Sequence, residues 1–240
     1  MSRIAVLSDI HGNLPALKAV VADAEARGCT AFLNLGDILS GPLWPAETAD
    51  YLMARDWPTI AGNHERQVLR LPLARMNASD AFTRPLLSEV QLGWLAALPE
   101  TLALDGLFLC HGTPVSDVEP MLETIEPVGI RRATEAEVAV RLGNRPEPIT
   151  LCGHSHIANM LQLADGRRVA NPGSVGLQAF HDDQPWPYSV EGGDPDARYA
   201  VIHGAEIALH AVAYDHQAAA AKAAREGRED WARGLATGKA

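Results

Sequence analysis

Cysteine is scarce in this sequence, and its distribution excludes one common way of stabilising a fold. The chain has three cysteines, Cys29, Cys110 and Cys152, and no two of them show CxxC spacing. An odd number of widely separated cysteines argues against a disulfide framework and is typical of a protein from a reducing compartment.

Long apolar runs and targeting signals are also missing. No run of 18 apolar residues occurs, so we expect no membrane-spanning helix. The first residues, MSRIAVLSDIHG, lead directly into a strand-like run and lack the apolar stretch and cleavage site of a signal peptide. We therefore expect a cytoplasmic enzyme or binding protein that does not associate with membranes.

Positive charge is in short supply. The 20 lysines and arginines are outnumbered by 30 acidic residues, which gives a formal net charge of −10. A surface for long nucleic acid needs a basic face, so we expect no such partner, although small nucleotides remain open. The 240 residues, 47% hydrophobic and 21% charged, have the composition of an ordinary globular protein.

Strand and helix patterns alternate through the first half of the chain, which indicates parallel strands with helices packed on their faces. The expected strands are 3–8, 31–36 and 58–62, and the expected helices are 14–28, 45–55 and 86–98.

The second half has a different pattern. Hairpins are expected at 101–112, 157–173 and 199–215, and a further strand at 149–153. Segment 179–197 is rich in Pro, Gly and Asp, contains Trp186 and Tyr188, and is expected to be a long loop. An Ala-rich helix is expected from His216, with a frayed end at 234–240. Together these patterns predict an α/β protein in which two sheets of parallel and antiparallel strands have helices on the outside, in a single domain over residues 1–240.

Residues that can bind metal follow the strands of the central set. They are Asp9, His11, Asp37, Asn63, His64, His111, His154 and His156. Ligands of open α/β sheets bind at the carboxyl ends of the strands, so these loops can converge on one site. The remaining histidines, which follow no such rule, are expected to be surface or hairpin residues: His181, His203, His210 and His216.

The number of these donors indicates two metal ions. Leaving His64 aside, seven residues are too many for one tetrahedral ion, but they supply four bonds to each of two ions if Asp37 bridges. Two ions about 3.5–4 Å apart suit phosphoester displacement. Nitrogen and oxygen ligands without thiolate favour Mn²⁺, Fe²⁺, Zn²⁺ or Ni²⁺, with manganese as the first expectation.

The motifs DIH, GD, GNHE, HG and GHSH, in this order along residues 9–156, resemble the calcineurin-like metallophosphoesterase superfamily, and NPGSVG at 171–176 resembles its small prokaryotic phosphodiesterase branch. The resemblance implies a four-layer αββα sandwich. It also implies two ligand sets that share Asp37: Asp9, His11, Asp37 and His156 for one ion, and Asp37, Asn63, His111 and His154 for the other.

Three residues beside the ligands carry further expectations. His64 is left without a metal and is expected to protonate the leaving group as the catalytic residue. Glu65 either orients His64 or lies on the surface, and Asn13 either contacts substrate or caps the helix that follows it.

The resemblance is incomplete after the GD motif. The protein serine/threonine phosphatases and symmetrical dinucleoside tetraphosphatases of this superfamily have an arginine there, whereas this chain continues GDILSGPLWP with no arginine before Arg55. This departure argues against both of those activities.

Three functions remain at this point. The first is a binuclear metal-dependent phosphodiesterase or phosphomonoesterase that uses a metal-bound hydroxide on a small phosphoester or nucleotide. The second is hydrolysis of a nucleotide pyrophosphate bond, as in dinucleoside polyphosphates. The third is a non-catalytic metal-binding scaffold, which the intact motif positions disfavour. The sequence leaves the oligomeric state open.

Overall fold

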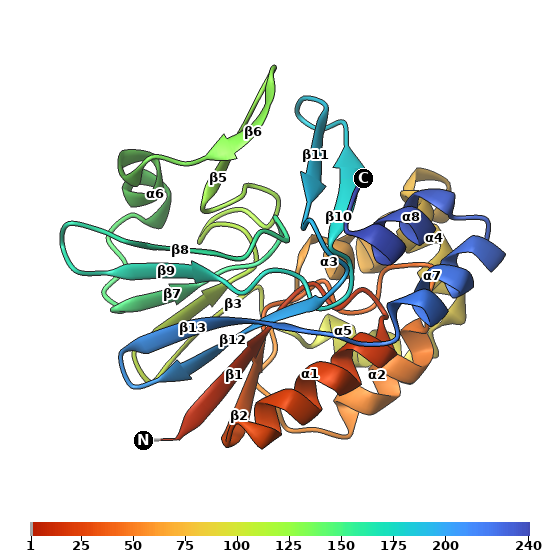
Figure 1. Cartoon of the computed structure of the whole chain (residues 1–240), viewed down its shortest axis with the longest axis horizontal. Helices are drawn as coiled ribbons and strands as arrows, with labels where there is room; N and C mark the ends of the chain where they lie inside the picture. The colour runs from red at the N-terminus through yellow and green to blue at the C-terminus, as the bar shows by residue number, and fades with distance from the viewer. Residues whose placement is uncertain (1) are drawn as a thin grey trace.

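Two mixed β-sheets face each other in the computed structural model, which describes residues 2–240 (Figure 1). The first sheet has the strand order β13-β12-β1-β2, with β1 parallel to β2 and antiparallel to β12. Its strands are β1 (Arg3–Leu7), β2 (Cys29–Asn34), β12 (Ala197–His203) and β13 (Glu206–Val212).

The second sheet has the order β3-β4-β7-β9-β8, in which β4, β7 and β9 are mutually parallel. Its strands are β3 (Thr101–Leu104), β4 (Leu107–Cys110), β7 (Ile149–Leu151), β8 (Asn159–Gln162) and β9 (Arg168–Asn171). The expected hairpins at 101–112, 157–173 and 199–215 are confirmed as β3–β4, β8–β9 and β12–β13.

Apolar side chains of both sheets form the central core, among them Val6, Leu33, Leu109 and Leu151. The strands β4 and β7 are buried along their whole length, because a second layer covers each outer face. The helices α1 (Leu14–Ala26), α2 (Pro45–Met53) and α5 (Glu89–Ala96) pack on the first sheet, and α6 (Glu135–Leu142) packs on the second. The four-layer αββα fold is therefore confirmed.

Helix α1 illustrates how local sequence sets an element. Asn13 caps its first turn by accepting a hydrogen bond from the backbone N–H of Ala16, and Gly28 follows the last turn with a φ of 82°. Leu17, Val20 and Ala24 are spaced to lie on one face, and all three are fully buried.

Two expected elements of the first half are wrong or too long. Segment 58–62 forms only an isolated bridge between Thr59 and Asn34, because its backbone pairs with β2 only at Asn34, the last residue of that strand, which is too short a length to make a strand. The helix expected at 86–98 is shorter: a 3₁₀ turn at Arg84–Leu86 precedes it, and Ser88 caps α5 through the backbone N–H of Gln91.

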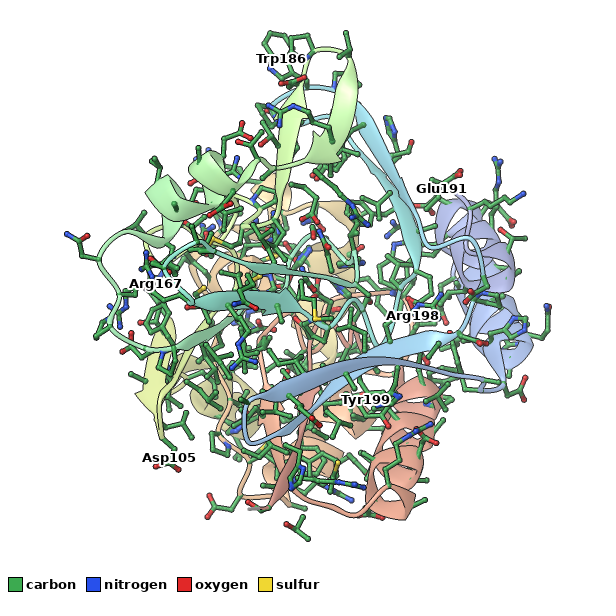
Figure 2. The ribbon with its side chains drawn as sticks, turned by 60° about the vertical axis from the view of Figure 1, so that its left-hand side comes forward. Asp105, Arg167, Trp186, Glu191, Arg198 and Tyr199 are labelled. Carbon is green, nitrogen blue, oxygen red and sulfur yellow. The ribbon has the colours of Figure 1, made fainter. Side chains whose placement is uncertain are left out.

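The expected loop at 179–197 is wrong, because it contains a regular hairpin. Strands β10 (Ala179–Asp182) and β11 (Tyr188–Glu191) pair antiparallel, so that Phe180 faces Val190. Trp186 lies at the turn of this hairpin, at an outer end of the molecule, with 48% of its surface exposed (Figure 2).

The end of the chain differs from a frayed tail. Two helices, α7 (His216–Arg225) and α8 (Glu229–Thr237), pack against each other, and Trp231 and Leu235 of α8 are buried with Leu43 and Leu177. In this segment burial of apolar side chains outweighs the low intrinsic order of a terminus.

Several short helices and strands were not predicted from the sequence. They are α3 (Asn63–Arg70), α4 (Ala78–Thr83), the hairpin of β5 (Glu123–Glu126) and β6 (Gly129–Arg132), helix α6, and a 3₁₀ turn at Leu73–Arg75. Among the helices of residues 2–240, none has the length and apolar character needed to cross a bilayer.

Candidate metal centre

The strand-end loops converge at one edge of the two sheets, and all seven expected ligands lie there. Asp9 and His11 follow β1, Asp37 follows β2, His111 follows β4, and His154 and His156 follow β7. Asn63 is the first residue of α3. Six of these side chains form two clusters in which the ligand atoms lie within 4.8 Å of one another: Asp9, His11 and His156 in one, and Asp37, His111 and His154 in the other.

The first cluster brings three ligand atoms into direct contact. The Nε2 atoms of His11 and His156 are 3.0 Å apart, and His156 Nε2 is 3.3 Å from Asp9 Oδ1. Two imidazole nitrogens and a carboxylate oxygen turned toward one point form a typical binding site for a divalent transition metal.

The second cluster adjoins the first. His111 Nε2 lies 3.0 Å from Asp37 Oδ2 and 3.9 Å from Asp9 Oδ1, so it links the two groups. Asn63 joins this cluster, since its Oδ1 is 3.0 Å from His154 Nδ1. The two clusters therefore form one continuous site that is suited to two metal ions.

Backbone carbonyls fix the orientation of the four imidazoles. The Nδ1 atoms of His11, His111 and His156 lie 2.7, 2.8 and 2.7 Å from the carbonyl oxygens of Ser40, Leu35 and Leu177, which leaves each Nε2 facing the centre. His154 is reversed: its Nε2 lies 3.0 Å from the Val118 carbonyl, and its Nδ1 faces inward. Such outer hydrogen bonds select the tautomer that a metal ion requires.

Two buried polar atoms at the centre have no hydrogen-bond partner. They are Asp9 Oδ1 and His111 Nε2. Burying a carboxylate oxygen without a partner costs free energy. A divalent cation bound between these two atoms would offset that cost. The residues present therefore fit a pair of metal ions.

The electrostatics keep most ligands in the forms that bind metal. Burial, together with the neighbouring His156, lowers the pKa of His11 to about 3. Burial and His111 lower the pKa of His154 to about 4. Burial opposes ionisation of the two aspartates, but His156 lowers the pKa of Asp9 and His111 lowers that of Asp37 below their usual range. At neutral pH both imidazoles are neutral and both carboxylates are charged.

His111 behaves differently because its Nε2 lies 3.0 Å from the Asp37 carboxylate, beside which the imidazole keeps its proton at neutral pH. Burial opposes its charged form, but Asp37 outweighs this and raises the pKa of His111 to about 10. Metal binding at this cluster would displace that proton.

The backbone at the centre is strained. Five of the ligands have φ values in the left-handed region: 54° at Asp9, 53° at His11, 52° at Asp37, 68° at His154 and 59° at His156. This conformation costs a non-glycine residue roughly 1–2 kcal/mol. Strain of this kind persists where the surroundings enforce it and is concentrated at functional sites.

Glu65 is one of the groups that enforce the backbone geometry. Its carboxylate accepts hydrogen bonds from the backbone N–H groups of Asp37 (2.8 Å), Ile38 (2.9 Å) and Gly62 (2.8 Å), and the residue is 1% exposed. Neither expected role is right: Glu65 holds the GD loop against the start of α3 instead of orienting His64 or lying on the surface.

Gly62 leaves space for a ligand. A Cβ atom at this position would lie 2.3 Å from Asp37 Oδ1 and 2.8 Å from the backbone nitrogen of Asp37. Any side chain here must displace the carboxylate of Asp37.

We expect Gly62→Ala to lower the stability of the protein by about 1–3 kcal/mol, because the added methyl group overpacks the GD loop. It should also weaken metal binding, since Asp37 must move. Gly93→Ala is the matched control: Gly93 lies in α5 with no atom within 4 Å of the added Cβ, and the change should stabilise by about 0.5–1 kcal/mol. Urea unfolding and metal titration of both variants measure these effects, and a Gly62→Ala protein with unchanged metal affinity would contradict the steric role.

His64 stands beside the ligands and belongs to neither cluster. Its Nε2 is 4.0 Å from Asp37 Oδ2, and its Nδ1 lies 2.6 Å from Oδ1 of Asp80, a fully buried residue of α4. Burial opposes the charged imidazole, but Asp37 and Asp80 raise the pKa of His64 to about 9. His64 can therefore carry a proton at neutral pH and present it from Nε2 toward the centre.

Asp80 was missed by the sequence reasoning. It also accepts hydrogen bonds from the hydroxyl of Ser40 and, at 2.7 Å, from the side chain of Asn77. The only local signal was a capping pattern, since the Asn77 side chain accepts from the backbone N–H groups of Ser79 and Asp80. That pattern predicts the start of a helix but gives no indication of a contact with His64.

The NPGSVG segment lies against the DIH loop. The hydroxyl of Ser174 donates to the carbonyl of Asp9 (2.8 Å), and the backbone N–H of Gly176 donates to the same oxygen (2.9 Å). Asn13, which is fully buried, caps α1 and donates to the carbonyl of Gly176 and the hydroxyl of Tyr214. Of its two expected roles, the structure shows the cap.

A pocket of about 440 Å³ opens over the metal centre. Its inner part is lined by His64 and by five of the seven expected ligands, all but Asp9 and His111, and its outer part by side chains of α4, the β10–β11 hairpin and α8. The sequence reasoning missed most of the outer residues, and it treated His181, which lines the pocket, as an ordinary hairpin residue.

Fold and site together define a class of protein: an αββα sandwich with two His/Asp clusters, suited to a pair of metal ions, at the ends of its strands. The chain belongs to the calcineurin-like phosphoesterase superfamily, whose domain model matches residues 2–190.

Two solved structures share the fold over nearly the whole chain. A metallophosphoesterase from Sphaerobacter thermophilus superposes with a TM-score of 0.77 at 24% identity, covering 99% of each chain. A hypothetical protein from Pyrococcus horikoshii OT3 superposes with a TM-score of 0.78 at 19% identity, covering 100% of each chain.

A curated relative is similar over a shorter stretch. An uncharacterized protein of Methanocaldococcus jannaschii is 35% identical over 103 residues, which is 41% of this chain and 42% of the relative. The match thus spans less than half of that relative's length.

Proposed function

We propose that this protein hydrolyses small phosphoesters, phosphodiesters first among them, with the help of two divalent transition-metal ions. The observation that supports this best is the contact between the two clusters, in which His111 Nε2 lies 3.0 Å from Asp37 and 3.9 Å from Asp9. Two ions held by clusters that contact each other in this way would suit in-line displacement at phosphorus better than a structural role.

The ligand set favours Mn²⁺, with Fe²⁺, Zn²⁺ and Ni²⁺ as alternatives, because it combines imidazoles, carboxylates and an amide without thiolate. When bound, the two ions would supply the charge that activates water and neutralises the phosphoryl oxygens.

The chain's own contribution to the reaction is a positioned proton. His64 donates its Nδ1 proton to Asp80, so its Nε2 proton faces the pocket beside Asp37. A proton donor in this place can protonate the alkoxide that leaves phosphorus.

Hydrolysis of a panel of esters tests the proposal. Manganese-loaded protein should hydrolyse bis-4-nitrophenyl phosphate faster than 4-nitrophenyl phosphate. Higher activity on diadenosine tetraphosphate than on either ester would instead indicate a nucleotide pyrophosphohydrolase, and no turnover of any of the three would contradict the proposed function.

Metal content is a separate expectation. We expect about two ions per chain after loading, because the two clusters together with Asn63 offer separate ligand sets. Binding to the folded state alone should raise the free energy of unfolding by about 2.7 kcal/mol per site at a metal concentration 100 times the Kd. Elemental analysis and thermal unfolding with and without a chelator measure both. One ion or none in folded protein with excess Mn²⁺ would contradict the binuclear assignment.

A further inference from the structure

The outer part of the pocket is lined by side chains that do not belong to the two metal-ligand clusters. Its side chains come from three segments that are far apart in the sequence: the start of α4, the β10–β11 hairpin and α8. In Figure 1 the last two of these lie next to each other, with β10 beside α8. Nothing in the proposed reaction at the metal centre requires these residues, so they are available to recognise the rest of a substrate.

The hairpin supplies an aromatic wall directly beside the metal centre. The ring of Phe180 is 4.7 Å from that of the ligand His156, in an edge-to-face arrangement, and 6.1 Å from that of Tyr188. Both residues line the pocket: Phe180 is half-buried, and Tyr188 is buried and donates its hydroxyl to Asp182 at 3.4 Å. A ring fixed in this way can pack against a planar group of the substrate.

Helix α8 supplies a cation that is free to bind an anion. Two arginines of this region line the pocket, but Arg228 is already engaged: it forms two hydrogen bonds with Asp230, at 2.9 and 2.6 Å, and donates to Ser79 at 3.1 Å. Arg233 is exposed and forms no ion pair with any carboxylate of residues 2–240.

Helix α8 is anchored well enough to hold Arg233 in place. Trp231, two residues earlier, is 6% exposed, and its ring lies 5.8 Å from that of the ligand His11. Gly234, the next residue after Arg233, packs so closely on β10 that an added Cβ would lie 2.6 Å from the carbonyl of Ala179. The helix is thus fixed both to the ligand loop and to the strand that carries Phe180.

We infer that Phe180 and Arg233 form a specificity subsite for a nucleoside that carries a second phosphate. Phe180 packs on the base or sugar, and the guanidinium of Arg233 binds the additional phosphate while the reacting phosphoester lies at the metal centre. The inference rests on the proposed function and names its substrate class: small nucleotide esters that carry a second phosphate group, in preference to alkyl esters.

Three esters that release the same 4-nitrophenolate test the subsite. They are methyl 4-nitrophenyl phosphate, thymidine 5′-(4-nitrophenyl phosphate) and its 3′-phosphorylated derivative. Manganese-loaded wild-type protein should show a KM about threefold to tenfold lower for the 3′-phosphorylated ester than for the unphosphorylated nucleoside ester, the range of a partly solvated charge-assisted contact. Arg233→Gln should abolish this difference. Arg225→Gln removes the same charge from an exposed position of α7 outside the pocket, and should preserve it.

Phe180→Leu tests the aromatic wall. This variant keeps an apolar side chain beside His156, and it should raise KM for both nucleoside esters by about fivefold or more while leaving the methyl ester unchanged. Equal effects on all three esters would mean that Phe180 only supports the metal centre.

Binding without turnover separates this inference from the proposed function. Calorimetry on the metal-loaded protein should show tighter binding of thymidine 3′,5′-bisphosphate than of thymidine 5′-monophosphate, and Arg233→Gln should remove the preference. If the esters are hydrolysed but Arg233→Gln leaves the preference intact, the subsite is wrong and the function stands. If no ester is hydrolysed, the proposed function fails, and the calorimetric preference or its absence still decides the subsite.

Discussion

Replacing Asp37 by alanine should disturb both metal ions and lower kcat/KM for bis-4-nitrophenyl phosphate by about 10³-fold or more, since the charge stabilisation that metal ions provide is worth several kcal/mol. Asp37 lies between the clusters: its Oδ2 is 3.0 Å from His111 Nε2, and its charge partly opposes the lowering of the pKa of His11, in the other cluster, that burial and His156 cause. It also accepts a hydrogen bond from the backbone N–H of His64, at 2.9 Å, so its loss frees the start of α3.

The matched comparison is Asn63→Ala. Asn63 contacts only the second cluster, through His154, so this variant should keep about one ion where Asp37→Ala keeps fewer. Elemental analysis of both proteins after loading, with circular dichroism to show that they fold, makes the comparison. Two ions retained in Asp37→Ala, or identical losses in the two variants, would show that Asp37 does not bridge.

Replacing His64 by alanine should leave the metal content unchanged and lower kcat by about 10²–10⁴-fold for esters with alkoxide leaving groups, the usual range for a general acid. The loss should be much smaller for 4-nitrophenolate, which leaves without a proton. Measurement of kcat over a series of leaving groups, with elemental analysis of the same samples, gives both readouts. Equal loss for all leaving groups, or loss of metal, would contradict the assignment.

Asp80→Asn tests how His64 is positioned. Because Asp37 and Asp80 raise the pKa of His64 to about 9, removal of the Asp80 charge should lower that pKa. The proton donor must be protonated to act, so activity falls as pH rises through its pKa, and the basic limb of the kcat profile should move to lower pH in this variant. A merely structural role of Asp80 would reduce activity without moving the limb.

The sequence predicted the fold well where the signal was local. Buried strands such as 3–8 and 31–36 are runs of apolar residues, and the hairpins have turn residues such as Asp105 and Gly106, so their pattern is independent of the rest of the chain. The prediction of a strand at 58–62 was wrong. The segment resembles a strand because it is a short apolar run, but such a run does not show how much of a neighbouring strand is available to pair with it.

The last quarter of the chain was predicted less well, because its order depends on distant partners. The Pro- and Asp-rich composition of 179–197 indicates a loop, yet Phe180 packs on His156 and Tyr188 is buried, which stabilises a hairpin. Likewise Leu235 is fully buried beside α7 in a stretch whose composition predicts fraying.

The sequence by itself determined which side chains gather at the candidate metal centre, because parallel strands end at the same edge of a sheet and all the candidate ligands except Asn63 follow such strands. Only the tertiary structure decided how that centre is held and what surrounds it. The left-handed backbone at five ligands, the clamp of Glu65 on the GD loop and the contact of Asp80 with His64 have no periodic signature in the sequence. Phe180 and Arg233 join the same pocket because β10 and α8 pack together, and packing between segments so far apart along the chain depends on shape and burial that no local pattern records.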